Sequence, residues 1–302
     1  MNVIFYIWRI ARRISIWLRW RMCDQILPIF TVLELWWTNC YCQSRITRPT
    51  GVVVSLTSYG KRISTVYLTI ESIVRGRVRP SRIILWLDES KAFHDLPASL
   101  RRLKDRGLEI KLCKDYGPYK KFYPYVESQS IFDTPLVTAD DDMLYPAFWL
   151  EELLNTFAAF PETVNCHHAR DIKLDEEGIA RFSEWRPCRS AEPAFRHYVV
   201  GYSGAIYPPG FLRVLKKAGR GFEECCPWGD DVWLHVQALR SGFKIRQIRA
   251  QAPFFPIIPG TQAAALWKHN DQSGGNDAQI EATYAFDDIQ ILREEPALHR
   301  PQ

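Results

Sequence analysis

The chain lacks several patterns that would assign a function at once. Its 302 residues contain no C-x-x-C pair among eight cysteines, no P-loop and no dinucleotide-binding glycine motif. These absences disfavour a cysteine-held metal site, a P-loop enzyme and a Rossmann dehydrogenase. There is no internal repeat and no low-complexity tract, and 47% hydrophobic with 24% charged residues is ordinary globular composition. We expect the cysteines to be reduced thiols in a cytosolic setting.

Lysine is missing from the first 50 residues, which hold seven arginines and two acidic residues. This segment therefore has a net charge of +5, equal to that of the whole chain, and the remainder is neutral. A neutral body does not favour a nucleic-acid-binding surface, so we expect no nucleic-acid partner.

The leader, residues 1–48, is predicted to be a basic, aromatic-rich helical segment. At about 100° per residue, two sets of side chains fall on opposite arcs: Arg9, Arg12, Arg13 and Arg19 on one, and Ile7, Ile10, Ile14, Trp17 and Leu18 on the other. Such a helix suits the headgroup region of an anionic membrane. A second apolar stretch, residues 26–37, is too short to span a bilayer. No signal-peptide cleavage site is evident.

The leader therefore predicts a cytoplasmic protein that is peripheral on the inner face of the plasma membrane. The alternative is that the leader packs as a helical hairpin on the body or on another subunit.

Residues 49–302 are predicted to form one α/β domain. Short apolar runs alternate with helical segments, which favours a doubly wound, mostly parallel sheet. The expected strands are 51–56, 82–87, 108–113, 136–139, 163–168 and 243–248, and the expected helices are 64–74, 96–106, 119–130, 148–159 and 229–240. Ser64 is expected to cap the first of these helices. Residues 201–210 are interpreted as a glycine- and proline-rich loop.

Three consecutive aspartates, Asp140, Asp141 and Asp142, follow the predicted strand 136–139. Three adjacent carboxylates repel one another, and a divalent cation relieves that repulsion because hard cations prefer oxygen ligands. Open α/β sheets bind ligands at the carboxyl ends of their strands. The triplet is therefore a candidate metal and phosphate site, and the alternative is an acidic loop that caps the next helix.

Other polar residues are candidates for binding a nucleotide. Thr57, Ser58, Tyr59 and Arg62 follow the first strand, where hydroxyls and cations at a strand–helix junction suit a base and phosphates. Lys120 precedes the acid-bearing strand and could offset phosphate charge. Taken alone, the segment after the first strand is equally well explained as an ordinary turn, and the segment containing Lys120 as a solvated helix start.

A second acid pair, Asp230 and Asp231, opens a predicted helix between Trp228 and Trp233. Acids at a helix start favour the helix dipole, but one carboxylate of a pair can also act on a reacting hydroxyl. We expect Asp231 to be the base and Asp230 to cap the helix. The tryptophans offer flat faces on which a sugar can stack. His269, in a polar segment near the C-terminus, is a candidate metal ligand.

In this order, these segments resemble bacterial family-2-like glycosyltransferases of surface polysaccharide synthesis. The resemblance covers residues 51–280 and includes 54–62, 84–87, 119–121, 138–142, 145–146, 207–210, 230–233, 269–270 and 274–277. It implies a glycosyltransferase A fold, which is Rossmann-like, a nucleoside-diphosphate-sugar donor with UDP-sugar favoured, and Mn²⁺ or Mg²⁺. It also implies that the triplet is an Asp-x-Asp motif, with Asp140 near the ribose or donor sugar and Asp142 on the metal.

The resemblance further implies that the acid pair, Asp230 and Asp231, holds the catalytic carboxylate, and of the two we prefer Asp231 as the base. The acceptor, a saccharide or lipid-linked molecule, would meet Trp228, Trp233 and the loop containing Gly204. Two other classes remain open: a metal-dependent nucleotidyl or phosphotransfer enzyme that uses the same carboxylates, and a non-enzymatic membrane-bound sugar-binding protein.

Overall fold

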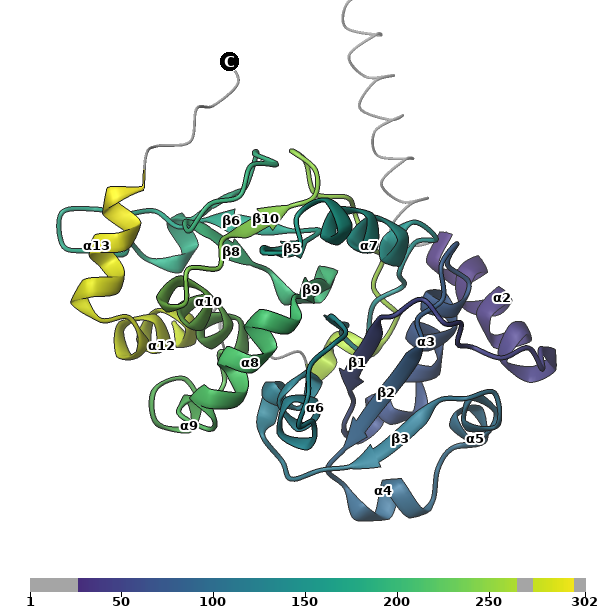
Figure 1. Cartoon of the computed structure of the whole chain (residues 1–302). Helices are drawn as coiled ribbons and strands as arrows, with labels where there is room; N and C mark the ends of the chain where they lie inside the picture. The colour runs from purple at the N-terminus through teal and green to yellow at the C-terminus, as the bar shows by residue number, and fades with distance from the viewer. Residues whose placement is uncertain (1–26, 265–273, 296–302) are drawn as a thin grey trace, which may run out of the picture.

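A seven-stranded sheet forms the centre of the molecule (Figure 1). The computed structural model describes residues 27–264 and 274–295. The strands are β1 (Val53–Thr57), β2 (Arg82–Leu87), β3 (Glu109–Leu112), β4 (Leu136–Thr138), β5 (Val164–Cys166), β9 (Ala205–Tyr207) and β10 (Ile245–Gln247), in the spatial order β10-β5-β9-β4-β1-β2-β3. All neighbours pair in parallel except β9, which is antiparallel to both β4 and β5. The predicted mostly parallel α/β sheet is confirmed.

Helices cover both faces of the sheet because successive strand residues point to opposite sides. Val54 and Leu56 of β1 pack into one core and Val53 packs into the other. The first core receives side chains from α3 (Val66–Val74), α5 (Ala98–Asp105) and α7 (Trp149–Ala159), and the second from α6 (Tyr123–Ser128), α8 (Pro209–Ala218) and α10 (Asp230–Arg240). A sheet buried on both faces reads as near-continuous apolar runs, which is the pattern that predicted these strands.

Two predicted helices begin differently from expectation. α3 begins at Val66, because the 3₁₀ turn η2 (Gly60–Ser64) occupies the preceding residues, and Ser64 therefore does not cap it. The segment 119–130 divides into the 3₁₀ turn η3 (Gly117–Lys121) and α6. Pro124 lies in the first turn of α6, where the missing N–H costs no helical hydrogen bond.

A second, three-stranded sheet was missed by the sequence analysis. It consists of β6 (Ala169–Asp171), β7 (Arg186–Pro187) and β8 (His197–Val199), in the order β7-β6-β8, all antiparallel. Each strand has only two or three residues, which is too short for a two-residue period to be recognised. β9 was missed for the same reason and lies in the segment interpreted as a loop.

The remaining helices lie at the periphery of the molecule (Figure 1). They are α2 (Leu27–Tyr41), α4 (Ser90–His94), α9 (Phe222–Cys225), α12 (Gly275–Thr283) and α13 (Phe286–Glu294). Within the described part of the chain, no helix has the length and apolar character that crossing a bilayer requires. The predicted amphipathic helix of the leader, whose two arcs comprise residues 7–19, lies outside the described residues.

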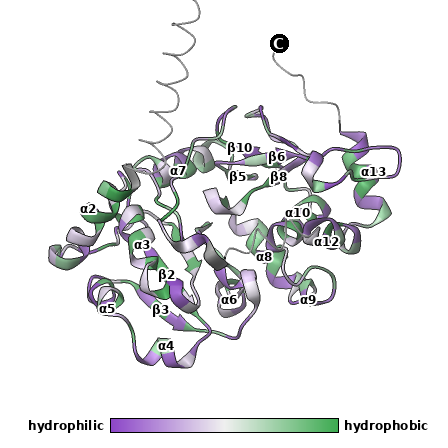
Figure 2. Cartoon of the chain, turned by 180° about the vertical axis from the view of Figure 1, so that it is seen from behind, coloured by the Kyte–Doolittle hydropathy of each residue, from purple (hydrophilic) through white to green (hydrophobic). Residues whose placement is uncertain are grey.

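α2 packs on the domain through one face only. Leu35 is fully buried with Leu68, Leu144 and Ile258, while Asn39 donates to Glu71 over 3.0 Å. Part of α2 is green, and so hydrophobic, in Figure 2. The face opposite Leu35 carries exposed apolar side chains, namely Ile29, Phe30, Leu33, Trp36, Trp37 and Tyr41.

Candidate active site

The acid triplet and the loop after β1 meet at one edge of the sheet. β1 and β4 are parallel neighbours, so their carboxyl ends lie side by side. The Ser58 hydroxyl donates to Asp141 Oδ2 over 2.5 Å, and Arg62 Nη1 donates to Asp141 Oδ1 over 2.8 Å. Arg62 Nη2 also lies 3.0 Å from Asp142 Oδ2. One guanidinium therefore neutralises two members of the triplet.

Lys121 joins the acid triplet to the acid pair of α10. Its ammonium lies 3.3 Å from Asp140 Oδ1 and 2.7 Å from Asp230 Oδ2. Burial opposes the charged form of Lys121, but the charges of Asp140, Asp230 and Asp231 outweigh it and hold the pKa of Lys121 well above its ordinary value. Two acid clusters that are far apart in the sequence thus converge on one permanent cation.

Asp231 is the carboxyl best suited to accept a proton. Its Oδ2 accepts a hydrogen bond from the Gly201 amide over 2.9 Å. Its Oδ1 is buried and has no hydrogen-bond partner among the described residues. Burial, and then the charge of Asp230, raise the pKa of Asp231 to about 7. A carboxylate that titrates near neutrality has the basicity that general-base catalysis needs.

Asp230 does not cap α10 as predicted. Gly229 occupies the N-cap position and no side-chain cap bond forms, since the Asp230 carboxylate lies against Lys121 instead. The interaction with a buried lysine outweighs local capping here.

Asp140 and Asp142 could hold a divalent cation together with phosphate oxygens. Burial, and then the charge of Asp140, raise the pKa of Asp142 to about 6, and Arg62 opposes the shift. Gln262 also donates to Asp142 Oδ2 over 2.9 Å. Within the described ranges, no third histidine, cysteine or acid joins these two in a three-ligand set. Mg²⁺ is commonly bound by one or two carboxylates plus substrate phosphates, so this donor set fits an ion carried on a diphosphate. His269 lies outside the described residues.

The other predicted nucleotide-binding residues line the same edge. The Thr57 hydroxyl donates to the Trp86 carbonyl over 3.0 Å. The exposed Tyr59 ring has the Arg62 guanidinium carbon and Lys120 Nζ each 5.9 Å from its centroid.

Lys120 is held between two acids rather than facing the triplet. Its ammonium lies 2.5 Å from Asp88 Oδ2 and 2.7 Å from Asp115 Oδ1. The sequence analysis selected Lys120 and missed Lys121, the neighbour that contacts Asp140. Both lie in η3, and no periodicity in so short a turn distinguishes the two side chains.

The three predicted acceptor-binding residues do not share one surface. Trp228 is 49% exposed, whereas Trp233 is 6% exposed and packs edge-on against Phe222. Gly204 has φ = +87°, and a Cβ there would lie 2.6 Å from the Trp149 ring. Trp233 and Gly204 therefore have packing roles, and Trp228 remains the candidate for stacking on a sugar.

Comparisons with known proteins add little. No protein-family model matches the chain, and no curated protein matches it. Among solved structures, one similar chain is a CMP:2-keto-3-deoxy-manno-octonic acid synthetase in complex with CTP, with 12% sequence identity and a TM-score of 0.41. The match covers 65% of this chain and 88% of that chain. A likeness this distant says nothing about activity.

Proposed function

We propose that the chain is a metal-dependent, inverting glycosyltransferase that moves a sugar from a nucleoside-diphosphate sugar to a hydroxyl acceptor. The observation that carries this proposal is Asp231, whose unpartnered Oδ1 and pKa of about 7 suit a general base. Lys121 pairs with both Asp140 of the acid triplet and Asp230, the neighbour of Asp231. These two ion pairs support a reaction in which the base and the diphosphate site share one cation.

In the proposed reaction, Asp231 Oδ1 takes the proton of the acceptor hydroxyl. The acceptor oxygen forms a bond to the anomeric carbon while the bond from that carbon to the diphosphate oxygen breaks. Direct displacement of this kind inverts the anomeric configuration. The Gly201 amide orients the carboxylate through its bond to Oδ2.

Asp142, with Asp140 beside it, would hold Mn²⁺ or Mg²⁺ on the donor diphosphate. When bound, the ion supplies charge stabilisation to the departing nucleoside diphosphate. Ser58 and Arg62 hold the Asp141 carboxylate through hydrogen bonds, and Arg62 also pairs with Asp142. Tyr59 and Thr57 would contact the nucleoside, for which uridine is favoured by the family resemblance.

The same resemblance favours a saccharide or lipid-linked acceptor and a role in cell-surface polysaccharide synthesis. Trp228 is the exposed aromatic on which an acceptor sugar could stack. The exposed apolar face of α2, together with the basic leader, supports binding of the enzyme to an anionic membrane surface.

Calorimetric titration of UDP, with and without Mn²⁺, tests the donor side of this proposal. We expect Mn²⁺ to tighten UDP binding to the wild-type chain and to have no such effect on Asp142→Asn. Asp133→Asn is the matched control, because Asp133 is an exposed acid that precedes β4 while the triplet follows it. Metal-independent binding in the wild type, or unchanged metal dependence in Asp142→Asn, would refute the assignment.

A further inference from the structure

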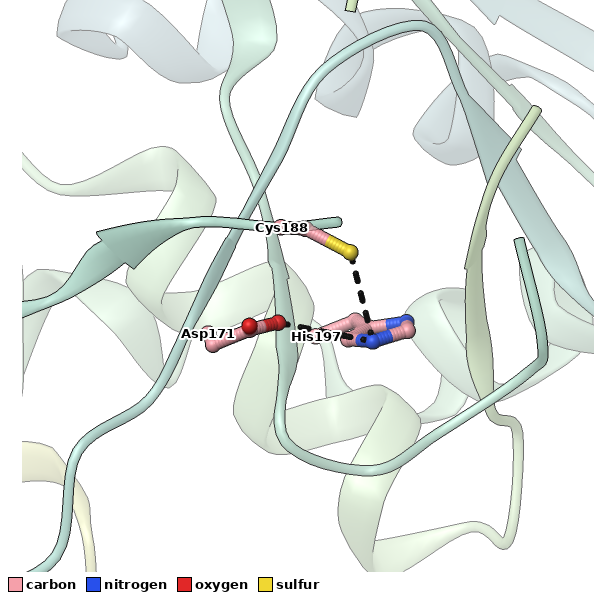
Figure 3. A group of neighbouring side chains, drawn as sticks. All are labelled: Asp171, Cys188 and His197. Carbon is pink, nitrogen blue, oxygen red and sulfur yellow. Dashed lines mark hydrogen bonds and ion pairs between the residues drawn. The ribbon is translucent and has the colours of Figure 1, made fainter. Parts of the chain in front are cut away.

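The small sheet brings together three side chains that the proposed reaction does not use (Figure 3). Asp171 ends β6 and lies directly opposite His197 of β8 in the strand register. Cys188 follows β7, and its amide donates to the Ala169 carbonyl of β6 over 3.0 Å. Cross-strand pairing thus places a carboxylate, an imidazole and a thiol on one side of the sheet.

The three ligand atoms have the spacing of a metal's coordination shell. His197 Nε2 lies 3.3 Å from Cys188 Sγ and 3.5 Å from Asp171 Oδ1, and all three atoms fall within 4.8 Å of one another. A tetrahedral zinc with ordinary bond lengths would require an S–N separation of about 3.6 Å and an N–O separation of about 3.4 Å. The two separations in the structure lie within about 0.3 Å of these values.

The orientation of the imidazole argues against a cysteine–histidine–aspartate catalytic triad. His197 Nδ1 lies 3.1 Å from the Ile245 carbonyl oxygen, which can only accept, so Nδ1 carries a proton. Both Cys188 and Asp171 therefore face the other nitrogen, Nε2. In a nucleophilic triad the acid and the nucleophile would lie on opposite nitrogens. A ring whose second N–H is held by a carbonyl is instead typical of a metal ligand.

Without a cation, the Cys188 S–H is the one hydrogen that these three side chains can place between them, because the Nδ1–H of His197 is held by the Ile245 carbonyl. Asp171 Oδ1 is buried and has no hydrogen-bond partner within the described ranges. Cys188 lies within hydrogen-bonding distance of the Ser190 carbonyl, at 3.3 Å, as well as of Nε2. A divalent ion between the three atoms would satisfy them all.

We propose that Asp171, Cys188 and His197 bind one Zn²⁺ ion per chain. Thiolate with imidazole selects zinc over Mg²⁺ or Mn²⁺, which prefer oxygen ligands. Binding transfers the Cys188 thiol proton to solvent and forms the S–Zn bond. The Asp171 side chain is 42% exposed, so water can complete a tetrahedral shell.

The zinc site would have a structural effect that reaches Asp231. It would link β6, β8 and the residue after β7, and β8 leads through Val200 to Gly201, whose amide holds Asp231. The proposed zinc site is separate from the proposed Mn²⁺ or Mg²⁺ site on Asp142 and does not depend on the enzymatic activity.

Cobalt substitution tests the site without any activity assay. We expect the metal-free, full-length chain to bind one Co²⁺ ion. Binding should produce a near-ultraviolet thiolate-to-Co²⁺ charge-transfer band, and added Zn²⁺ should displace the Co²⁺ and remove the band. Cys188→Ser should lose the band, and Cys113→Ser, which removes another partly buried thiol, should keep it. No band in the wild type, or a band that persists in Cys188→Ser, would overturn the proposal.

Asp171→Asn provides a second test that depends less on the fold, because this side chain is partly exposed. We expect its zinc affinity, measured by competition with a chelating dye, to fall by about tenfold or more. Unchanged affinity would remove Asp171 from the site and overturn the three-ligand assignment. Chelator should also lower the melting temperature of the wild type and not that of Cys188→Ser.

Discussion

Asp231 is the residue whose surroundings most directly support the proposed reaction. Asp231→Asn should reduce sugar transfer by about a hundredfold or more, the usual scale for losing a general base. Nucleoside diphosphate affinity should hardly change, because Asp231 contacts the acceptor in the proposed reaction. Transfer rate and UDP affinity, measured on the same preparation, check both expectations.

Asp230→Asn is the matched control for this substitution. It removes the 2.7 Å ion pair with Lys121 but leaves the Gly201–Asp231 bond in place. We expect a smaller loss of transfer than in Asp231→Asn. The reverse order would assign the base to Asp230, and full activity in both variants would exclude the pair from the chemistry.

Asp231→Asn should also keep or raise the melting temperature at pH 8. A carboxyl whose pKa is raised on folding contributes stability below its unfolded pKa and loses that contribution as pH rises through the folded value, here about 7. At pH 8 the buried carboxylate is therefore a cost, which the neutral amide removes. A clearly lower melting temperature would show that the charge of Asp231 stabilises the fold.

Transfer should depend on pH through the same carboxyl. Only the deprotonated form of Asp231 can accept a proton, so the rate with saturating donor should rise with pH through about 7 and level off above it. A rate profile between pH 5 and pH 9 measures this. A flat profile across this range would contradict the role of Asp231.

Gly201 tests the position of the base. A Cβ there would lie 2.7 Å from Asp231 Oδ1 and 2.8 Å from Lys121 Nζ, so Gly201→Ala must displace the carboxylate. We expect transfer to fall by up to about a hundredfold while UDP affinity is retained. Gly210→Ala is the control, since its Cβ would meet only the Phe243 ring, at 3.1 Å, and the Arg213 guanidinium, at 3.8 Å.

At the residue scale, the sequence identified the carboxylates but not their partners. Consecutive aspartates after an apolar run are visible without a structure. The position of Lys121 between Asp140 and Asp230 cannot be found from the sequence, because it depends on how η3 and α10 approach each other. The Asp171–Cys188–His197 cluster is equally invisible, since its members come from three short segments with no metal-ligand spacing.

At the element scale, α2 provides a test of membrane binding. Phe30 and Trp37 are 67% and 60% exposed on its outer face. Phe30→Glu and Trp37→Glu should each weaken sedimentation with anionic vesicles by about tenfold, because each removes a large apolar contact with the bilayer. Phe286→Glu is the control, as Phe286 is an exposed aromatic on the distant helix α13 (Figure 1).

A deletion variant that tests the leader should lack residues 1–26 only. Removing residues 1–48 would strip Leu35 from its contacts with Leu68 and Ile258 and so would destabilise the domain as well. Deleting residues 1–26 alone should reduce binding to anionic vesicles more than to neutral ones. Unchanged sedimentation, or indifference to lipid charge, would reject a membrane role for this segment.

The sheet was predictable where its strands are long or fully buried. All six predicted strands are present. In β1, β2 and β4, burial on both faces leaves near-continuous apolar runs that the sequence shows. β9 was not predictable, since Ala205–Tyr207 lies between Gly204 and Pro208 and pairs only through the tertiary fold. β6, β7 and β8 are likewise defined by their partners rather than by their own residues.

At the scale of the whole molecule, the site depends on both halves of the chain. The segments that follow β1 and β4 deliver Ser58, Arg62 and the acid triplet, and α10 delivers the acid pair. Lys121 and the Gly201 amide connect the two sets. This arrangement predicts that donor and acceptor meet where the parallel strands border antiparallel β9.

The most direct measurement is the identity of the nucleotide product. The purified chain, with a panel of nucleoside-diphosphate sugars, Mn²⁺ and saccharide acceptors, should release a nucleoside diphosphate in step with glycosylated acceptor. Release should fall about a thousandfold in Asp142→Asn, as expected when one charged ligand of the ion is lost. Release of pyrophosphate from a nucleoside triphosphate and a sugar acid or sugar phosphate would instead identify a nucleotidyltransferase and contradict the glycosyltransferase assignment.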